Sequence, residues 1–303
     1  MQLDEKKNVR LALGAATFAL LGSAVSSPDA VADERWKVDS TVLFYSEPDR
    51  VSAVEPVVSG TKELSEEEFL NLKLTLDALT GASANGATAT NVLQTFTRPS
   101  GRGSYTTAAG ETPLDDTFHD TRVALAVNWE KPISRMVKSS LGANVSKEYD
   151  YLSLGLNASL SRDFNQRNTT VSAGVSFASD TIEPEGGIPT AFASMQPAGT
   201  AQPRDDSSDN KTTADLLFGV TQVLGKNTLG QLNLSFSQSD GYMTDPFKVL
   251  SVVDGTTGST LDYIYEGRPD SRQKSSLYAA LKHYFGGDVL NLAARVMDPQ
   301  SGR

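Results

Sequence analysis

Hydrophobic and polar residues alternate along most of the chain with a period of two. Between positions 70 and 78, every even position is leucine or alanine and every odd position is polar. The segments 152–160, 171–177 and 214–220 repeat this pattern, the last less strictly. One face of each segment is therefore apolar and the other largely polar, which is typical of a β-strand with two different surroundings. A helix would scatter the same leucines around its circumference.

Eleven strands are predicted from this alternation. The second is the least regular, because Pro56 has no N–H group to donate to a ladder. The predicted strands are 37–46, 50–59, 68–79, 118–129, 135–146, 150–162, 168–179, 212–224, 228–239, 272–285 and 288–297.

The gaps between these strands alternate in length. Short turns are predicted after every second strand, at 60–67, 130–134, 163–167, 225–227 and 286–287. All three long gaps, 80–117, 180–211 and 240–271, fall at the other end of the sheet. Outer-membrane barrels have short periplasmic turns and longer external loops. We therefore expect an all-β fold, an antiparallel up-and-down transmembrane β-barrel. A soluble β-sandwich is the alternative fold.

Aromatic residues concentrate near the predicted strand ends. Outer-membrane barrels carry two aromatic girdles where hydrocarbon meets the lipid headgroups. One predicted girdle consists of Trp36, Phe69, Trp129, Phe164, Tyr284 and Phe285. The other consists of Tyr45, Phe118, Tyr149, Tyr151, Phe177 and Tyr242.

Residues 1–32 have the order of features found in a secretory signal peptide. A basic start with Lys6, Lys7 and Arg10 precedes an apolar stretch at 11–25, and Ala30-Val31-Ala32 offers small residues for cleavage. We expect residues 33–303 to form the exported barrel domain of a protein from a Gram-negative bacterium, located in its outer membrane.

Composition excludes several classes of protein. The 303 residues carry a net charge of −10, which makes nucleic acid an unfavourable partner. Cysteine is absent, so there are no disulfides and no thiolate metal sites. No apolar run reaches the ~18 residues of a transmembrane helix. The loop 81–88 resembles a phosphate-binding loop in spacing, but Ala87 stands where lysine is needed. We expect no cofactor.

The end of the chain fits a closed barrel poorly. Eleven strands is an odd number, the alternation stops abruptly near Val296, and the segment 297–303 has no terminal aromatic residue. Single-chain bacterial barrels close with an even number of strands. The prediction is therefore an incomplete barrel that lacks its C-terminal strands and has 12–14 strands when complete.

Several stretches resemble one bacterial family, catalogued as domain of unknown function 3570. The most specific is Leu-Asp-Ala-Leu-Thr-Gly-Ala-Ser-Ala-Asn-Gly-Ala-Thr at 76–88, and 47–51, 115–122 and 146–151 are also similar. The resemblance covers about 36–292, and residues 293–303 depart from it. It implies an exported outer-membrane barrel without defined catalytic residues. Genes of that family often lie beside genes for a flavin transferase and a thioredoxin-like protein, so the resemblance also implies a cell-envelope redox setting.

Charged residues on the polar face of the strands are the main candidates for function. Small polar side chains leave room for water, and isolated charges in a pore adjust its ion preference. The predicted lumen-lining charges are Lys73, Asp77, Arg122, Lys138, Asp215, Lys282 and Arg295.

Two weaker candidates lie in the predicted outer loops. Asp205, Asp206 and Asp209 form an oxygen-rich segment that could hold a hard cation such as Ca²⁺, although a solvated acidic loop is the simpler interpretation. His119 lies near Asp116 and Asp120 and keeps a barrel hydrolase as a third hypothesis. Adjacent strand residues point to opposite faces, however, so we expect a protein that is not an enzyme.

The sequence thus predicts a porin-like or solute-binding outer-membrane barrel for small polar solutes. A structural barrel that docks a periplasmic redox protein is the first alternative, and a secreted β-sandwich binding protein is the second. The expected partners of the barrel are outer-membrane lipid and the barrel assembly machinery, with no nucleic acid.

Overall fold

The computed structural model describes residues 36–48, 50–98 and 103–301. The predicted signal peptide, 1–32, lies outside the described residues. No helix in the described part of the chain is long and apolar enough to cross a membrane.

Eleven strands form one antiparallel sheet in which each strand pairs with its neighbours in chain order. Two further strand pairs, β4–β5 and β12–β13, lie outside this sheet. The eleven strands are β1 (Lys37–Ser46), β2 (Val51–Ser65), β3 (Glu68–Ala84), β6 (Leu114–Ser134), β7 (Val137–Lys147), β8 (Tyr151–Phe164), β9 (Thr169–Ile182), β10 (Asp209–Gly225), β11 (Thr228–Gly241), β14 (Ser271–Phe285) and β15 (Asp288–Ser301).

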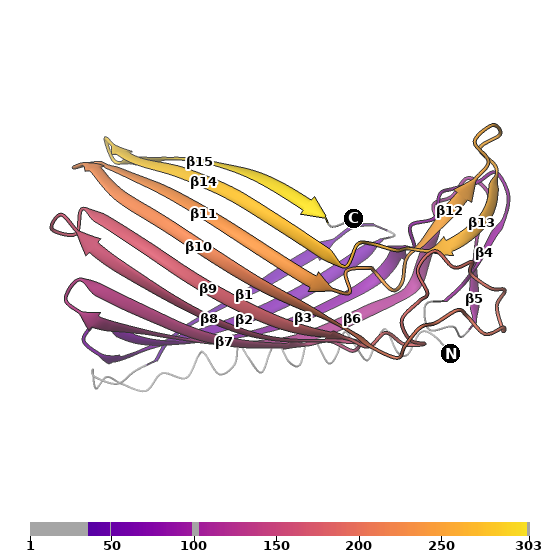
Figure 1. The fold of residues 1–303 in the computed structure, drawn as a ribbon, viewed down its shortest axis with the longest axis horizontal. Helices are drawn as coiled ribbons and strands as arrows, with labels where there is room; N and C mark the ends of the chain where they lie inside the picture. Colours follow the sequence, from indigo (N-terminus) through magenta and orange to yellow (C-terminus); the bar gives the residue numbers. More distant parts are fainter. Residues whose placement is uncertain (1–35, 49, 99–102, 302–303) are drawn as a thin grey trace.

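The sheet curves into the wall of a barrel that is open between its first and last strands (Figure 1). Strands β1 and β15 are the two edges and do not pair with each other. The predicted strand number and up-and-down order are confirmed. The alternative of a β-sandwich is wrong, because the wall is a single sheet rather than two sheets packed face to face.

Several strands are longer than the sequence pattern predicts. The predicted turns at 60–67 and 130–134 are wrong, because β2 continues to Ser65 and β6 continues to Ser134. Polar residues at these ends still pair across the ladder, as Thr61 does with Asn71. The last strand likewise does not end at 297, because β15 pairs with β14 as far as Ser301 although the alternation has stopped.

Pro56 lies inside β2 rather than at a sheet edge. On one side it pairs with Val42 of β1. On the other side the ladder with β3 is interrupted between Val54 and Val57, and the register on both sides of the gap is the same. The missing N–H group therefore removes local pairing without creating a bulge.

The two faces of the wall differ in chemistry and in exposure. On β9, even positions from 170 to 178 are half-buried, whereas odd positions from 171 to 177 are exposed. A curved sheet shields the side chains on its concave face, so the even positions of β9 belong to that face. These residues are threonine, serine, glycine and alanine, and the odd positions include Val171, Val175 and Phe177.

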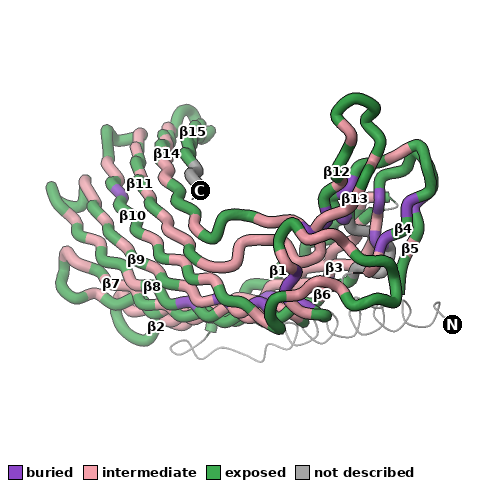
Figure 2. Tube along the Cα trace, turned by 45° about the vertical axis from the view of Figure 1, so that its right-hand side comes forward, coloured by how far each residue is buried: buried purple, intermediate pink, exposed green. Residues whose placement is uncertain are grey.

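Register carries this division around the whole wall, because paired residues project from the same face. The tube in Figure 2 shows that few positions in the wall are buried. One row of paired residues on the convex face runs through Leu160, Ala173, Phe218, Leu234, Leu277 and Val296. Its large side chains are between 39% and 70% exposed.

Aromatic residues form a convex girdle at the end of the wall with the short turns. The convex residues of the predicted set are Trp36, Trp129, Phe164 and Phe285. A basic side chain lies over two of these rings, Lys131 over Trp129 and Arg162 over Phe164.

Two members of this set are on the wrong face for a girdle. Phe69 and Tyr284 occupy concave register positions. At the other end of the wall, Tyr45 and Tyr151 are also concave and Phe177 is convex. The predicted second girdle is therefore not a continuous outward belt. The side chain of Phe118 lies outside the described part.

The three long loops fold together at the other end of the wall (Figure 1). We call the described residues of 85–113, 183–208 and 242–270 the cap. It contains two hairpins, β4 (Gln94–Thr97) with β5 (Ser104–Thr107) and β12 (Val249–Val253) with β13 (Thr260–Tyr265). The β12–β13 hairpin is formed by the apolar runs 247–253 and 261–265.

The cap has its own core and cross-loop bonds. Phe96 is 1% exposed and packs with Tyr105 and Tyr263, at ring-centroid distances of 5.5 Å and 4.9 Å. The Met195 N–H donates to the Tyr263 carbonyl at 2.8 Å, and the Val249 N–H donates to the Asn85 carbonyl at 2.8 Å. The three loops are therefore one packed unit, which loops that were merely solvated would not form.

Candidate functional site

All seven charges predicted from the sequence project from the concave face. Asp77 pairs in register with Arg122, and Lys138 belongs to the row that reaches Arg295 on β15. Lys73, Asp215 and Lys282 also occupy concave register positions, on β3, β10 and β14 respectively. The alternation therefore identifies the face correctly.

Two of the concave carboxylates have local partners. Asp77 forms an ion pair with Arg122, with Nη2 to Oδ2 at 3.3 Å. Asp215 accepts a hydrogen bond from the Ser176 hydroxyl at 2.7 Å. Both partners are cross-strand neighbours, so the sheet register holds these groups in place. The Asp77–Arg122 pair is partly exposed and its net contribution to stability is small.

Lys138 lies near the short-turn end and is paired with a turn residue. Its Nζ is 3.2 Å from Glu67, which sits between β2 and β3 with a φ of 60°. Arg167, between β8 and β9, also approaches Glu67 at 3.8 Å and donates to the Arg135 carbonyl at 3.0 Å. These contacts join three separate turns. Lys138 therefore helps to hold the turns together at this end of the wall.

The concave face between β7 and β9 is flat and polar. A Cβ atom on Gly142 would lie 2.5 Å from the Asn157 amide, and one on Gly155 would lie 2.3 Å from the Asn144 amide. The amide side chains therefore lie across the glycine positions of the neighbouring strand. Together with the nearby serine residues, they form an uncharged hydrogen-bonding patch between Lys138 at one end of these strands and Asp180 at the other.

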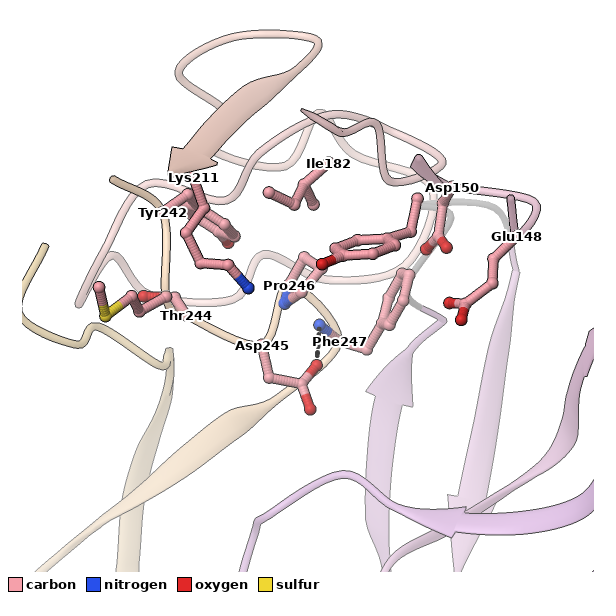
Figure 3. A pocket seen from close by; sticks show the side chains of 11 residues that line it. Glu148, Asp150, Ile182, Lys211, Tyr242, Thr244, Asp245, Pro246 and Phe247 are labelled. Carbon is pink, nitrogen blue, oxygen red and sulfur yellow. Dashed lines mark hydrogen bonds between the residues drawn. The ribbon is translucent and has the colours of Figure 1, made fainter. Parts of the chain in front are cut away.

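A pocket of about 240 Å³ lies where the wall meets the cap (Figure 3). It combines the β7–β8 turn, the ends of β8, β9 and β10, and the chain that leaves β11. We call it the mouth pocket. Its lining residues are Glu148, Asp150, Tyr151, Ile182, Lys211, Tyr242, Met243, Thr244, Asp245, Pro246 and Phe247.

A shielded ion pair lies beside the mouth pocket. Lys211 and Asp180 are register partners on β10 and β9, with Nζ 2.9 Å from Oδ2. The Asp180 side chain is 6% exposed. The Lys211 Nζ also lies 5.7 Å from the centre of the Tyr151 ring. Two partners hold the ammonium group, so it is oriented rather than free to move in water.

Two carboxyl groups in the β7–β8 turn, which lines the pocket, have environments that disfavour their charged form. Burial raises the pKa of Glu148 above its usual value, and the negative charge of Asp120 raises it further. Burial, followed by the charge of Asp120, also raises the pKa of Asp150, against a lowering backbone hydrogen bond. Both groups lie between β7 and β8, where a bound polar molecule or cation would reduce this electrostatic cost.

Tyr242 supplies a polar atom without a partner in the described residues. Its hydroxyl oxygen is buried and makes no hydrogen bond to any of them. Burial, together with the nearby charge of Asp245, raises its pKa to about 12. Buried hydroxyl groups are normally satisfied by protein, water or ligand. The mouth pocket therefore offers an aromatic surface and a neutral hydroxyl beside carboxylates.

The candidate cation site in the cap has no supporting geometry. No group of three or more histidine or acidic side chains among the described residues could hold a metal ion. Asp205 instead accepts a hydrogen bond from Thr190 at 2.7 Å, and Asp209 begins β10. The carbonyl of Asp206 accepts from the Ile188 N–H at 2.8 Å.

The candidate hydrolytic group is also not assembled by the fold. His119 and Asp120 pair with consecutive residues of β3 and therefore project from opposite faces, as the period-2 argument requires. The side chain of Asp116 lies outside the described part.

Sequence analysis missed the mouth pocket. Tyr151 and Tyr242 were assigned to an aromatic girdle, although both line the mouth pocket together with Lys211. The only local signal was the mixture of acidic and aromatic residues at 146–151 and 242–247. Their proximity depends on how the cap folds back, which the period of the strands does not encode.

A family model described as "Protein of unknown function (DUF3570)" matches residues 10–297. The chain belongs to this family. The match includes residues 293–297, which corrects the expectation that the DUF3570 pattern ends near residue 292. The matched region contains the cap and all of the wall except the last residues of β15.

Comparison with solved structures finds similarity to the outer membrane transporter YddB from Escherichia coli. The TM-score is 0.36, the sequence identity is 12%, and the alignment covers 83% of this chain. The chain spans only 35% of the length of that transporter chain. The comparison with curated proteins found no match.

Proposed function

We propose that this DUF3570 protein is an outer-membrane β-barrel whose concave wall passes or binds small polar solutes. One observation carries the proposal, namely that the two faces of the eleven-stranded wall have opposite chemistry. Large apolar side chains cover the convex face and are exposed there. Such a surface is unfavourable in water and favourable against hydrocarbon.

Strand length supports the same proposal. The eleven strands of the wall contain between 10 and 21 residues. A tilted transmembrane strand needs ~9–11 residues to cross the hydrocarbon core. Every strand of the wall is therefore long enough to span the membrane, and the cap lies beyond one rim. Export through residues 1–32 and assembly by the barrel assembly machinery are parts of this proposal.

The concave face suits an aqueous passage. Serine, asparagine, threonine and glycine dominate β7, β8 and β9 there, and charged groups lie at intervals along the wall. Such surfaces exchange hydrogen bonds with water and with polar solutes at little cost. The mouth pocket lies at the cap end of this face, where a solute would first meet oriented charged and aromatic groups.

Ion conductance in planar lipid bilayers tests the proposal. The full chain is expected to produce conductance above that of bare lipid. Asp77→Ala should change this conductance, because it removes a concave charge and leaves Arg122 without its carboxylate. Asp254→Ala is the matched control, since Asp254 lies in the β12–β13 turn and accepts bonds only within that turn.

Conductance also separates the proposal from its alternative. A structural barrel that docks a periplasmic redox protein would insert in the membrane but would not conduct. A correctly inserted wild-type chain without conductance would therefore contradict the proposed passage and favour the docking barrel.

A further inference from the structure

Four basic side chains occupy the concave face on the last two strands of the sheet, β14 and β15. Arg272, Lys274 and Lys282 lie on β14, and Arg295 lies on β15 opposite Tyr278. We call these four residues the basic strip. All four are exposed. None of them forms an ion pair with another described residue.

The described concave positions of β11, β14 and β15 contain no carboxylate, and Asp215 of β10 lies two strands from Lys274 in the same row. Described concave neighbours on β11, β14 and β15 are Gln231, Asn233, Ser235, Ser237, Ser239, Ser276, Tyr278, Ala280, Asn291, Ala293 and Met297. Elsewhere on the same face, Arg122 and Lys211 are each paired with an aspartate. The basic strip therefore places four basic side chains without an ion pair on two adjacent strands, whereas Lys73, which also has none among the described residues, stands alone on β3.

The four charges are distributed along the height of the wall. Arg272 and Lys282 are ten residues apart on one strand, which corresponds to about 33 Å at the usual rise per residue. Arg295 lies between them in height, because its register partner is Tyr278. Its guanidinium group is 5.5 Å from the centre of the Tyr278 ring, which fixes its position on the face. A small ion that moves along the wall would therefore remain near a positive charge.

We propose that the basic strip is a path for small anions along the concave wall. This inference rests on the proposed function, since it names the class of solute that the passage conducts. A unit charge about 7 Å away in water changes the local concentration of a monovalent ion roughly threefold. Salt screens this effect within about 10 Å at 0.1 M, so the influence of the strip is expected to weaken at high salt.

Acidic residues lie on the same face at the opposite edge of the sheet, on its first two strands. Asp39 and Glu55 occupy concave positions on β1 and β2. Cations are therefore attracted to the edge of the wall formed by β1 and β2, and anions to the edge formed by β14 and β15. For this reason, charge reversal within the basic strip is a sharper test than the sign of the wild-type selectivity.

Reversal potentials across a potassium chloride gradient test the proposal. Lys274→Glu and Lys282→Glu each change the local charge by two units, and each is expected to lower the ratio of chloride to potassium permeability by at least about threefold at 0.1 M salt, and less at 1 M. The control is Lys226→Glu, in the turn between β10 and β11, which should leave the ratio unchanged. Because the three lysines are exposed, all variants should reach the outer membrane at the wild-type level, which a membrane fraction verifies.

The possible results separate the two proposals. A conducting protein whose permeability ratio is the same in wild type and both strip variants would overturn the anion path and leave the proposed function intact. Equal changes in the strip variants and in Lys226→Glu would also overturn it, because the effect would not depend on the concave face. A wild-type chain that inserts and does not conduct would contradict both proposals.

Discussion

Replacing Phe218 with arginine is expected to destabilise the barrel by about 2–4 kcal/mol. Phe218 lies on the convex face of β10 and is 49% exposed. Its row of paired residues runs across the wall through large apolar side chains. An arginine near the middle of a membrane-spanning strand faces hydrocarbon and must be moved toward the headgroups or remain poorly solvated. Denaturant unfolding in lipid vesicles measures the loss.

Leu217→Arg is the matched control for this change. Leu217 is the adjacent residue, is similarly exposed at 45%, and projects from the concave face. The same substitution there should change the free energy of unfolding by about 0.5 kcal/mol or less, as at an ordinary wet surface. Equal losses for both variants would mean that the two faces of β10 meet the same environment. That result would contradict a wall whose convex face lies in lipid and whose concave face lies in water.

Replacing Phe96 with alanine is expected to destabilise the cap by about 3–5 kcal/mol. The Phe96 ring is 1% exposed and is the centre of the aromatic cluster with Tyr105 and Tyr263. Removing it leaves a cavity that these rings cannot fill without moving. The loss should appear as faster proteolysis of the cap in the assembled protein, because local opening exposes its loops.

The effect of Phe96→Ala should remain within the cap. The cap core contacts the wall mainly through loop segments, so the heat-dependent gel shift of the folded barrel should be unchanged. Leu93→Ala is the control, because Leu93 lies on the same loop and is 67% exposed. A collapse of the gel shift in Phe96→Ala alone would show that the cap is required for the wall to fold.

The wall could be predicted from sequence because its signal is local. Each strand has two surroundings, and a period of two records both in the identity of every residue. This pattern is strong between 152 and 160, and the predicted strand coincides closely with β8. It fades at the ends of β2 and β6, where Lys62 and Lys131 interrupt the apolar face. The ladder continues there, and the predicted boundaries were therefore too short.

The cap and the mouth pocket could not be predicted in the same way. Their contacts join segments up to about 170 residues apart, as the hydrogen bond between Gln94 and Tyr263 shows. Short strands such as β4 have too few residues to display a period. The charges predicted to line a lumen lie on the concave face as expected, because the face of a strand residue depends only on whether its position is odd or even. Their pairing depends on the register between strands, which placed Asp77 beside Arg122 and left the basic strip without partners.

Cysteine accessibility along β10 is the most direct test of the central claim. The chain contains no cysteine, so single substitutions can be labelled without background. In outer membranes, a water-soluble maleimide should label cysteines at Thr213, Asp215 and Leu217 and should not label those at Ala214, Leu216 and Phe218. Labelling of all six positions at similar rates would contradict a wall with one face in lipid and the other in water.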